Sequence, residues 1–178
     1  IMGAGLFAGL VAAGISLAGW SVDDPSLNHA TDMVATNYLG YPGAVIADEI
    51  MQVMGLGGIL FIALPLSWAI RLMRHERPGN FIFKILAWII ATLAAASALS
   101  SLPTPAAWRL AGGLGGNIGD IISSGALSVM AFALKGWFPQ ILTGIVSAYI
   151  AFSASLKALG LAGTEASGWA ERSVQWLV

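Results

Sequence analysis

The chain has 178 residues, of which 57% are hydrophobic and 10% charged, and its mean hydropathy is +0.81. Because soluble domains carry about 25% charged residues, this composition excludes an ordinary water-soluble domain and indicates a membrane protein. The net charge of −1 points to neither nucleic acid nor an acidic partner, and the absence of cysteine excludes disulfides and thiolate metal sites.

The first predicted membrane span covers residues 1–20, which carry no charge. At about 1.5 Å per residue it matches the ~30 Å thickness of a hydrocarbon core. Gly5, Gly9 and Ala13 form a stripe of small residues that suits close helix packing, although glycine is also common in membrane helices generally. The chain begins directly in this run without Met, so we expect the numbering to describe a fragment of a longer protein. A secretory signal peptide is the alternative interpretation.

An acidic loop, residues 21–49, is predicted to follow on the outer side of the membrane. It contains five acidic residues and no Lys or Arg: Asp23, Asp24, Asp32, Asp48 and Glu49. Pro25 predicts a turn because it fixes its own φ and disfavours the α conformation at the residue before it. From residue 42 or 43 onward, a short helix is expected to lead into the next span.

The second and third predicted spans, residues 50–70 and 81–102, flank a basic turn. Pro65 predicts a kink near residues 61–64 because it removes a helix hydrogen bond. The turn contains half of all Lys and Arg in the chain: Arg71, Arg74, Arg77 and Lys84. Since basic loops stay on the cytoplasmic side, these residues set the topology, and Lys84 is expected to reach toward the interface. Alanines crowd the second half of the third span and favour tight packing against a neighbouring helix.

The second outer loop is predicted to cover residues 103–138. Within it, residues 118–134 are apolar but too short to cross unaided, and we interpret them as a buried, interfacial or re-entrant helix. The fourth span is predicted at residues 139–159, and a fifth would exist only if 118–134 crosses. The sequence therefore predicts an all-α polytopic bundle, residues 1–163, with both termini cytoplasmic, followed by the start of a cytoplasmic linker at 164–178.

Enzymatic signals are nearly missing from the sequence, and no catalytic residue, metal site or cofactor is predicted. His29 and His75 are placed on opposite sides of the membrane and cannot form a pair. The centres of the four spans lack ionisable residues, which argues against a proton or ion path and favours anchoring or assembly. The glycine-rich run 112–119 lacks the Lys-Ser/Thr of a phosphate loop, and close backbone packing is the better interpretation.

Two outer aspartates, Asp24 and Asp48, have both a functional and a structural interpretation. Either could shape a surface for a partner. As structural residues, Asp24 would accept hydrogen bonds from backbone amides in its turn, and Asp48 would lie in the first turns of a helix, near the positive end of its dipole. The structural interpretation is favoured for both.

Three motifs in the outer loops carry a family resemblance. Residues 21–26 read SVDDPS, residues 37–48 read NYLGYPGAVIAD, and residues 115–119 read GGNIG. In this order and with these spans between them, they resemble the Ser-x-x-Asp-Pro-Ser, Asn-x-x-Gly-x-x-Gly-Ala-x-x-Ala-Asp and Gly-Gly-x-Ile/Leu-Gly elements of the FtsK/SpoIIIE septal DNA translocases. Leu27 departs from the aromatic residue that often follows the first element. The motif positions, structural or partner-binding, are Asp24, Pro25, Ser26, Asn37, Gly40, Gly43, Ala44, Ala47, Asp48, Gly115, Gly116 and Gly119.

The resemblance implies the four-span N-terminal membrane domain of such a translocase, at the division septum of a bacterial inner membrane. In that family a linker and a hexameric RecA-like motor follow, which pumps DNA with ATP. This chain has no Walker motif, so it is not expected to be an enzyme or to contact nucleic acid directly. The implied partners are the lipid bilayer, other cell-division membrane proteins and further copies of the chain, with a hexamer implied. The alternative is a small transporter or channel subunit, suggested by Pro65, the 118–134 segment and the glycine run.

Overall fold

The protein is an all-helical membrane bundle. The computed structural model describes residues 2–76, 79–130, 134 and 136–161. In this part of the chain there are six α-helices and no strand: α1 (Met2–Ala18), α2 (Gly40–Met54), α3 (Gly58–Met73), α4 (Phe81–Ser100), α5 (Gly116–Met130) and α6 (Phe138–Leu159). A short 3-10 turn, η1 (Gly55–Gly57), joins α2 to α3.

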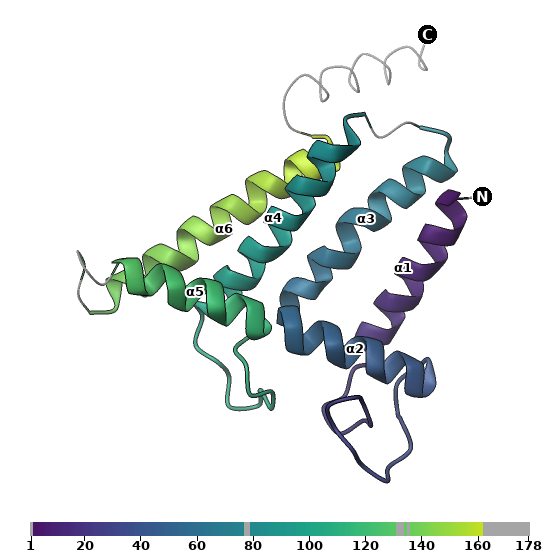
Figure 1. Ribbon diagram of the computed structural model, residues 1–178, viewed down its shortest axis with the longest axis horizontal. Helices are drawn as coiled ribbons and strands as arrows, with labels where there is room; N and C mark the ends of the chain where they lie inside the picture. The colour runs from purple at the N-terminus through teal and green to yellow at the C-terminus, as the bar shows by residue number, and fades with distance from the viewer. Residues whose placement is uncertain (1, 77–78, 131–133, 135, 162–178) are drawn as a thin grey trace.

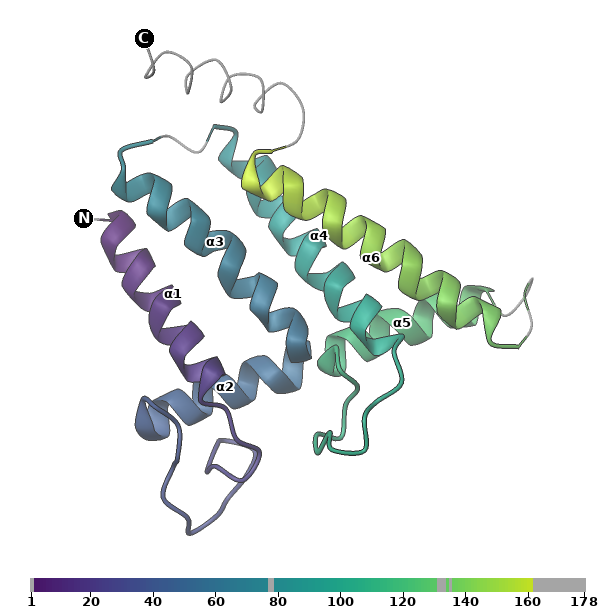
Figure 2. The ribbon, with the colours of Figure 1, turned by 180° about the vertical axis from the view of Figure 1, so that it is seen from behind.

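Four helices run side by side in the order α1, α3, α4, α6, and α2 and α5 lie across their ends (Figures 1 and 2). The segment Gly40–Met73, α4 and α6 are long and apolar enough to cross a membrane, and α1 is a shorter apolar helix. We call the end that carries α2, α5 and the loops 19–39 and 101–115 the loop end. The opposite end, with the start of α1, the α3–α4 turn and the end of α6, is the turn end. The described chain thus begins and finishes at the same end.

The core lies where α3, α4 and α6 meet. It is built from Leu64 and Trp68 of α3 and from small alanines of α4 and α6: Ala87, Ala91, Ala154 and Ala158. These alanines let the helix backbones approach closely, and the tight packing predicted for the third span is confirmed. The indole N–H groups of Trp68 and Trp88 donate to the carbonyls of Ala158 (2.8 Å) and Phe61 (3.0 Å). Both donors are therefore satisfied away from water, as a bilayer requires.

The small residue of α1 that makes a close helix contact is not one of the predicted stripe. The tight contact is at Gly3, where an added Cβ would lie 2.9 Å from the backbone nitrogen of Met73. Gly5 and Gly9 are exposed, and a Cβ on either would meet nothing within 4 Å. These two glycines of the stripe therefore take no part in packing among the described residues.

The second predicted span differs most from the structure. Residues 50–54 belong to α2, which lies across the bundle, and the crossing helix begins only at Gly58. The chain turns at Gly55, whose φ of +54° is a conformation that glycine adopts without strain. At Pro65, where a kink is predicted, α3 continues without a break.

The segment predicted at 118–134 corresponds to α5, which begins two residues earlier. At about 22 Å its fifteen residues are too short to cross a bilayer, and the helix lies across the ends of α4 and α6 (Figure 1). The five-span alternative is therefore wrong. The linker expected at 164–178 lies outside the described residues.

The two halves of the bundle repeat one unit: a crossing helix, a loop, a helix across the end and a second crossing helix. α2 and α5 each have 15 residues and begin at a glycine of positive φ, +64° and +65°. Aligned from these glycines, they share five residues: Gly40/Gly116, Gly43/Gly119, Ile46/Ile122, Val53/Val129 and Met54/Met130. Both units run in the same direction, as in parallel repeats of membrane proteins.

Candidate functional site at the loop end

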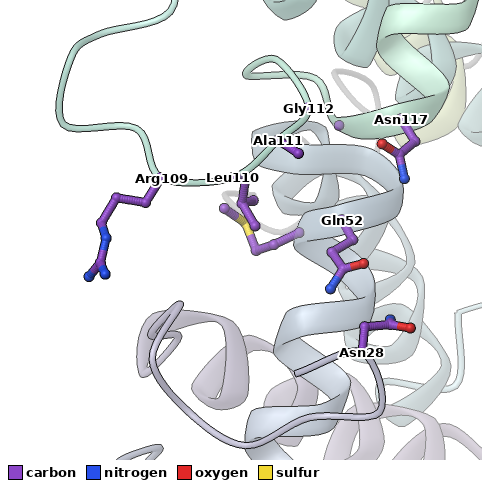
Figure 3. Close-up of a pocket in the computed structure, with 9 residues that line it drawn as sticks. Asn28, Gln52, Arg109, Leu110, Ala111, Gly112 and Asn117 are labelled. Atoms are coloured by element: carbon purple, nitrogen blue, oxygen red, sulfur yellow. The ribbon is translucent and has the colours of Figure 1, made fainter. Parts of the chain in front are cut away.

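A polar pocket opens at the loop end, where the two repeat units meet. Its volume is about 250 Å³, and its lining residues come from both loops and both crosswise helices: Asn28, Met51, Gln52, Arg109, Leu110, Ala111, Gly112, Gly116 and Asn117. Figure 3 shows the amides of Asn28, Gln52 and Asn117 along one side, with Arg109 extending away from them. The pocket is therefore a place where distant parts of the chain present polar groups together.

Two of the three amides are held by carboxylates through their N–H groups. Asn28 Nδ2 donates to Glu49 Oε1 (2.8 Å), and Gln52 Nε2 donates to Asp48 Oδ2 (2.7 Å). These bonds fix the side chains and leave their amide oxygens as hydrogen-bond acceptors. Arg109 pairs with Asp23 at 2.7 Å, with both side chains more than half exposed, so this ion pair stabilises the fold little.

Asp24 organises the first loop. Its carboxylate accepts hydrogen bonds from the Thr36 N–H (2.8 Å), the Thr36 hydroxyl (2.8 Å) and the Asn37 N–H (3.0 Å). Asn37 in turn donates through Nδ2 to the Ser16 carbonyl at the end of α1 (2.8 Å). The Ser26 hydroxyl, just after Pro25, accepts from the His29 N–H (3.1 Å). These motif residues tie the loop to the bundle. Asp24 has a structural role, but the amides that it holds are those of residues 36 and 37 rather than those of its own turn.

The second motif forms the start of α2. Gly40 donates its N–H to the Asn37 carbonyl (2.8 Å), and Gly43 packs so closely that an added Cβ would overlap Asn37 Oδ1 and lie 2.7 Å from Leu39 Cβ. Ala44 and Ala47 are buried on the same helix.

The position predicted for Asp48 is wrong. Asp48 is the ninth residue of α2, because the helix begins at Gly40, so its carboxylate lies beyond the first turn and outside the reach of the helix dipole. It is buried and bonded to Gln52 instead.

The third motif packs backbone against backbone. A Cβ on Gly116 would lie 2.5 Å from the Gly55 nitrogen, and the Leu56 N–H donates to the Leu114 carbonyl (2.9 Å). On the other side, a Cβ on Gly119 would lie 2.5 Å from the Ala96 carbonyl oxygen, and one on Gly115 would overlap the same atom. The glycine-rich element is thus wedged between the α2–α3 turn and α4. Close packing, rather than a ligand cradle, accounts for its glycines.

The described topology-setting residues lie at the turn end. Arg71 Nη2 donates to the Leu159 carbonyl at the end of α6 (2.6 Å), and Arg74 is exposed. The side chain of Lys84, in the first turn of α4, is only 4% exposed. The sequence, in contrast, predicts that it reaches toward the interface. Arg77 lies outside the described residues.

His29 and His75 lie at opposite ends of the bundle, and no group of three or more His, Asp or Glu able to hold a metal occurs among the described residues.

Several residues of this region were missed by sequence reasoning. Gln52 and Asn117 carry no motif signal, and their meeting depends on the α2–α5 contact. Hydroxyl contacts also join the helices near the loop end: Ser100 with Asp120 (2.6 Å), Ser97 with Ser147 (3.1 Å) and Ser101 with Ser123 (3.2 Å). Serine is too common in membrane helices for these pairings to have been predicted. Gly55, beside Gly57 and Gly58, was the one available signal for the turn.

Comparison with known proteins gives one consistent family. The model of the 4TM region of DNA translocase FtsK/SpoIIIE matches residues 1–164. A protein named DNA translocase FtsK from Brucella suis is 40% identical over 160 residues, covering 89% of this chain and 18% of the relative. The protein of that name from Agrobacterium fabrum is 41% identical over 113 residues, 63% of this chain and 13% of the relative. The one from Caulobacter vibrioides is 31% identical over 153 residues, 83% of this chain and 18% of the relative.

The chain spans less than a fifth of the length of these curated relatives. No solved structure matches it significantly.

Proposed function

This chain belongs to the FtsK/SpoIIIE DNA translocase family as its four-span membrane region, and on that premise we propose that it anchors and assembles the translocase at the division septum. The matched region lacks the motor, which lies elsewhere in the relatives, so the chain itself is not an enzyme. In the proposal, the whole protein couples DNA translocation to cell division, and this part contributes membrane attachment and protein contacts rather than contact with nucleic acid.

The charge distribution supports an orientation with the turn end in the cytoplasm of a bacterial inner membrane. Arg71, Arg74 and Lys84 lie at the turn end, and the described loop 19–39 carries no Lys or Arg. Positive residues in short loops favour the cytoplasmic side. Both described ends of the chain then face the cytoplasm, where a linker to a motor would continue.

The first loop is the surface that we propose for contact with other cell-division membrane proteins. Large apolar side chains are exposed on this loop: Leu27 is 71% exposed, Val34 87% and Tyr38 73%. The loop backbone is nevertheless fixed by the hydrogen bonds to Asp24. A braced loop loses little entropy on binding, and exposed apolar and aromatic side chains are the residues that interfaces bury. This braced loop with its exposed apolar side chains is the observation that carries the assembly role.

We also propose that copies of the chain associate within the membrane by contacts between their helices. Gly5 and Gly9 on α1 face away from the chain's own helices and leave open space beside them. A small-residue face of this kind permits close approach of a helix from a second copy. A hexamer is the state that the family resemblance implies.

The proposal is tested by imaging the chain, fused to a fluorescent protein, in dividing cells that lack the native membrane region. Enrichment at the septum is expected. A Gly125→Ala variant, which adds a methyl group in open space on α5, serves as the matched control and should localise equally. A uniform membrane signal would count against the assembly role.

The transporter or channel alternative gains no support from the structure. The region between α3, α4 and α6 is filled by Leu64, Trp68 and the core alanines. Flux through liposomes containing the chain should therefore equal that of empty liposomes.

A further inference from the structure

A second, apolar cavity lies between α1 and α3 near the loop end. Its volume is about 480 Å³, within the usual range of small-molecule pockets. Its walls are Gly14, Leu17 and Ala18 of α1 and four apolar residues of α3, and its end is lined by Met51, Leu56 and two indoles. We propose that this cavity binds one acyl chain of a membrane phospholipid.

The shape of the cavity follows from how α1 and α3 diverge. At the turn end the two helices touch, because an added Cβ on Gly3 would lie only 2.9 Å from the Met73 nitrogen. At Gly14 the nearest atom to an added Cβ is Ile62 Cγ2, at 4.0 Å. The helices therefore open toward the loop end, and the space left between them is the cavity.

Two tryptophans lie at the loop end of this space. The rings of Trp20 and Trp108 contact each other with centroids 6.3 Å apart, although they come from loops 88 positions apart in the sequence. Tryptophans concentrate at the membrane–water interface, so this end of the cavity lies at the level of lipid headgroups. The mouth lies on the side of the bundle, where Ile59 and Ala63 are exposed on α3.

One of the two indoles that line the cavity has no hydrogen-bond partner in the described part of the chain. The Trp20 indole nitrogen is buried and makes no hydrogen bond with any described residue, whereas Trp108 Nε1 donates to the Gly112 carbonyl (2.8 Å). A buried N–H without an acceptor destabilises the fold, so a ligand oxygen at this position is expected. An ester or phosphate oxygen of a phospholipid lies at this depth when its tail points toward the bilayer centre.

The geometry favours a lipid tail over a helix of another protein or of a second copy. A membrane helix would need a groove along the whole length of α1 and α3, but the contact at Gly3 closes it. The cavity extends only over the last turns of α1 and the first turns of α3, residues 14–18 and 59–66. A flexible hydrocarbon chain can enter such a short, blind space from the side.

The test uses the 178-residue chain in vesicles of phosphatidylethanolamine and phosphatidylglycerol, with a fraction of the phosphatidylglycerol carrying a diazirine on one acyl chain. After illumination, crosslinks are mapped by proteolysis and mass spectrometry. We expect the label to concentrate on residues 14–20 and 56–66. Ala63→Phe fills the mouth and should lose most of this label.

Ala148→Phe is the control, because Ala148 is also exposed but lies on α6, away from the cavity. It should keep the wild-type pattern. Ala18→Phe fills the cavity from the α1 side and provides a second test if Ala63→Phe lowers the helix content. Label spread evenly over the exposed faces, including that of α6, would overturn the proposal even without a variant. So would retention of the label in a folded cavity-filling variant.

Discussion

Gly55 and Gly116 meet backbone to backbone at the centre of the loop end: a Cβ atom on Gly116 would lie 2.5 Å from the nitrogen of Gly55. This contact joins the end of α2 in the first repeat unit to the start of α5 in the second. Both residues have positive φ, +54° and +65°. The polar pocket exists because this contact brings Gln52 and Asn117 to the same place.

Replacing Gly116 by alanine should therefore weaken the whole bundle. The new methyl group would meet the α2–α3 turn, and alanine would be strained at a φ of +65°. We expect the free energy of unfolding to fall by about 2–4 kcal/mol, combining backbone strain with overpacking. Unfolding by SDS in mixed micelles, followed by circular dichroism, measures the change.

Gly125→Ala is the matched control for that experiment. Gly125 also lies in α5, but an added Cβ meets nothing within 4 Å. Alanine there should be neutral or stabilise the helix by up to about 1 kcal/mol. Equal destabilisation by both variants would contradict the close contact at Gly116.

The parts of this fold that follow from local sequence were predictable. Twenty uncharged residues need no long-range information to indicate an apolar helix, and the alanines of α4 predict close packing wherever a partner lies. The glycine-rich element 115–119 was also interpreted correctly as a packing element, because it lacks the residues that would bind phosphate. Its partner, Gly55, was not identified.

The turn at Gly55 escaped prediction for a physical reason. Residues 50–70 carry no charge and are mostly apolar, and hydropathy does not distinguish a helix that lies across the bundle from one that crosses the membrane. The turn depends on the Leu114 carbonyl, 58 positions away, which accepts the Leu56 N–H. The misplacement of Asp48 has a related cause, since α2 was expected to begin later than Gly40.

Asp24→Ala should loosen the first loop without preventing membrane insertion. The substitution leaves the Thr36 and Asn37 amides without their acceptor, which is expected to destabilise the loop by about 1–3 kcal/mol. Insertion depends on the apolar spans and should not change. Limited proteolysis of the reconstituted chain should cut the loop faster than in the parent. Asp32→Ala, at an exposed position in the same loop, should leave the cutting rate unchanged.

Gly43→Val should disturb the start of α2. The valine side chain would overlap Asn37 Oδ1 and crowd Leu39, so Asn37 must give up its hydrogen bond to the Ser16 carbonyl or α2 must shift. We expect a loss of about 2–4 kcal/mol in unfolding free energy from overpacking and the broken bond. Gly125→Val serves as the comparison, because its side chain would enter open space on α5. A similar loss for both would show that valine itself, rather than the crowding, weakens the helices.

The proposed orientation can be read from two single cysteines, because the native chain contains none. Val34 is 87% exposed at the loop end, and His75 is exposed in the turn after α3. If basic residues hold the turn end in the cytoplasm, an impermeant maleimide added to intact cells should label Val34→Cys and spare His75→Cys. His75→Cys should then react once the cells are lysed, which shows that its thiol is accessible. Labelling of His75→Cys in intact cells would reverse the orientation and move the proposed partner surface to the cytoplasm.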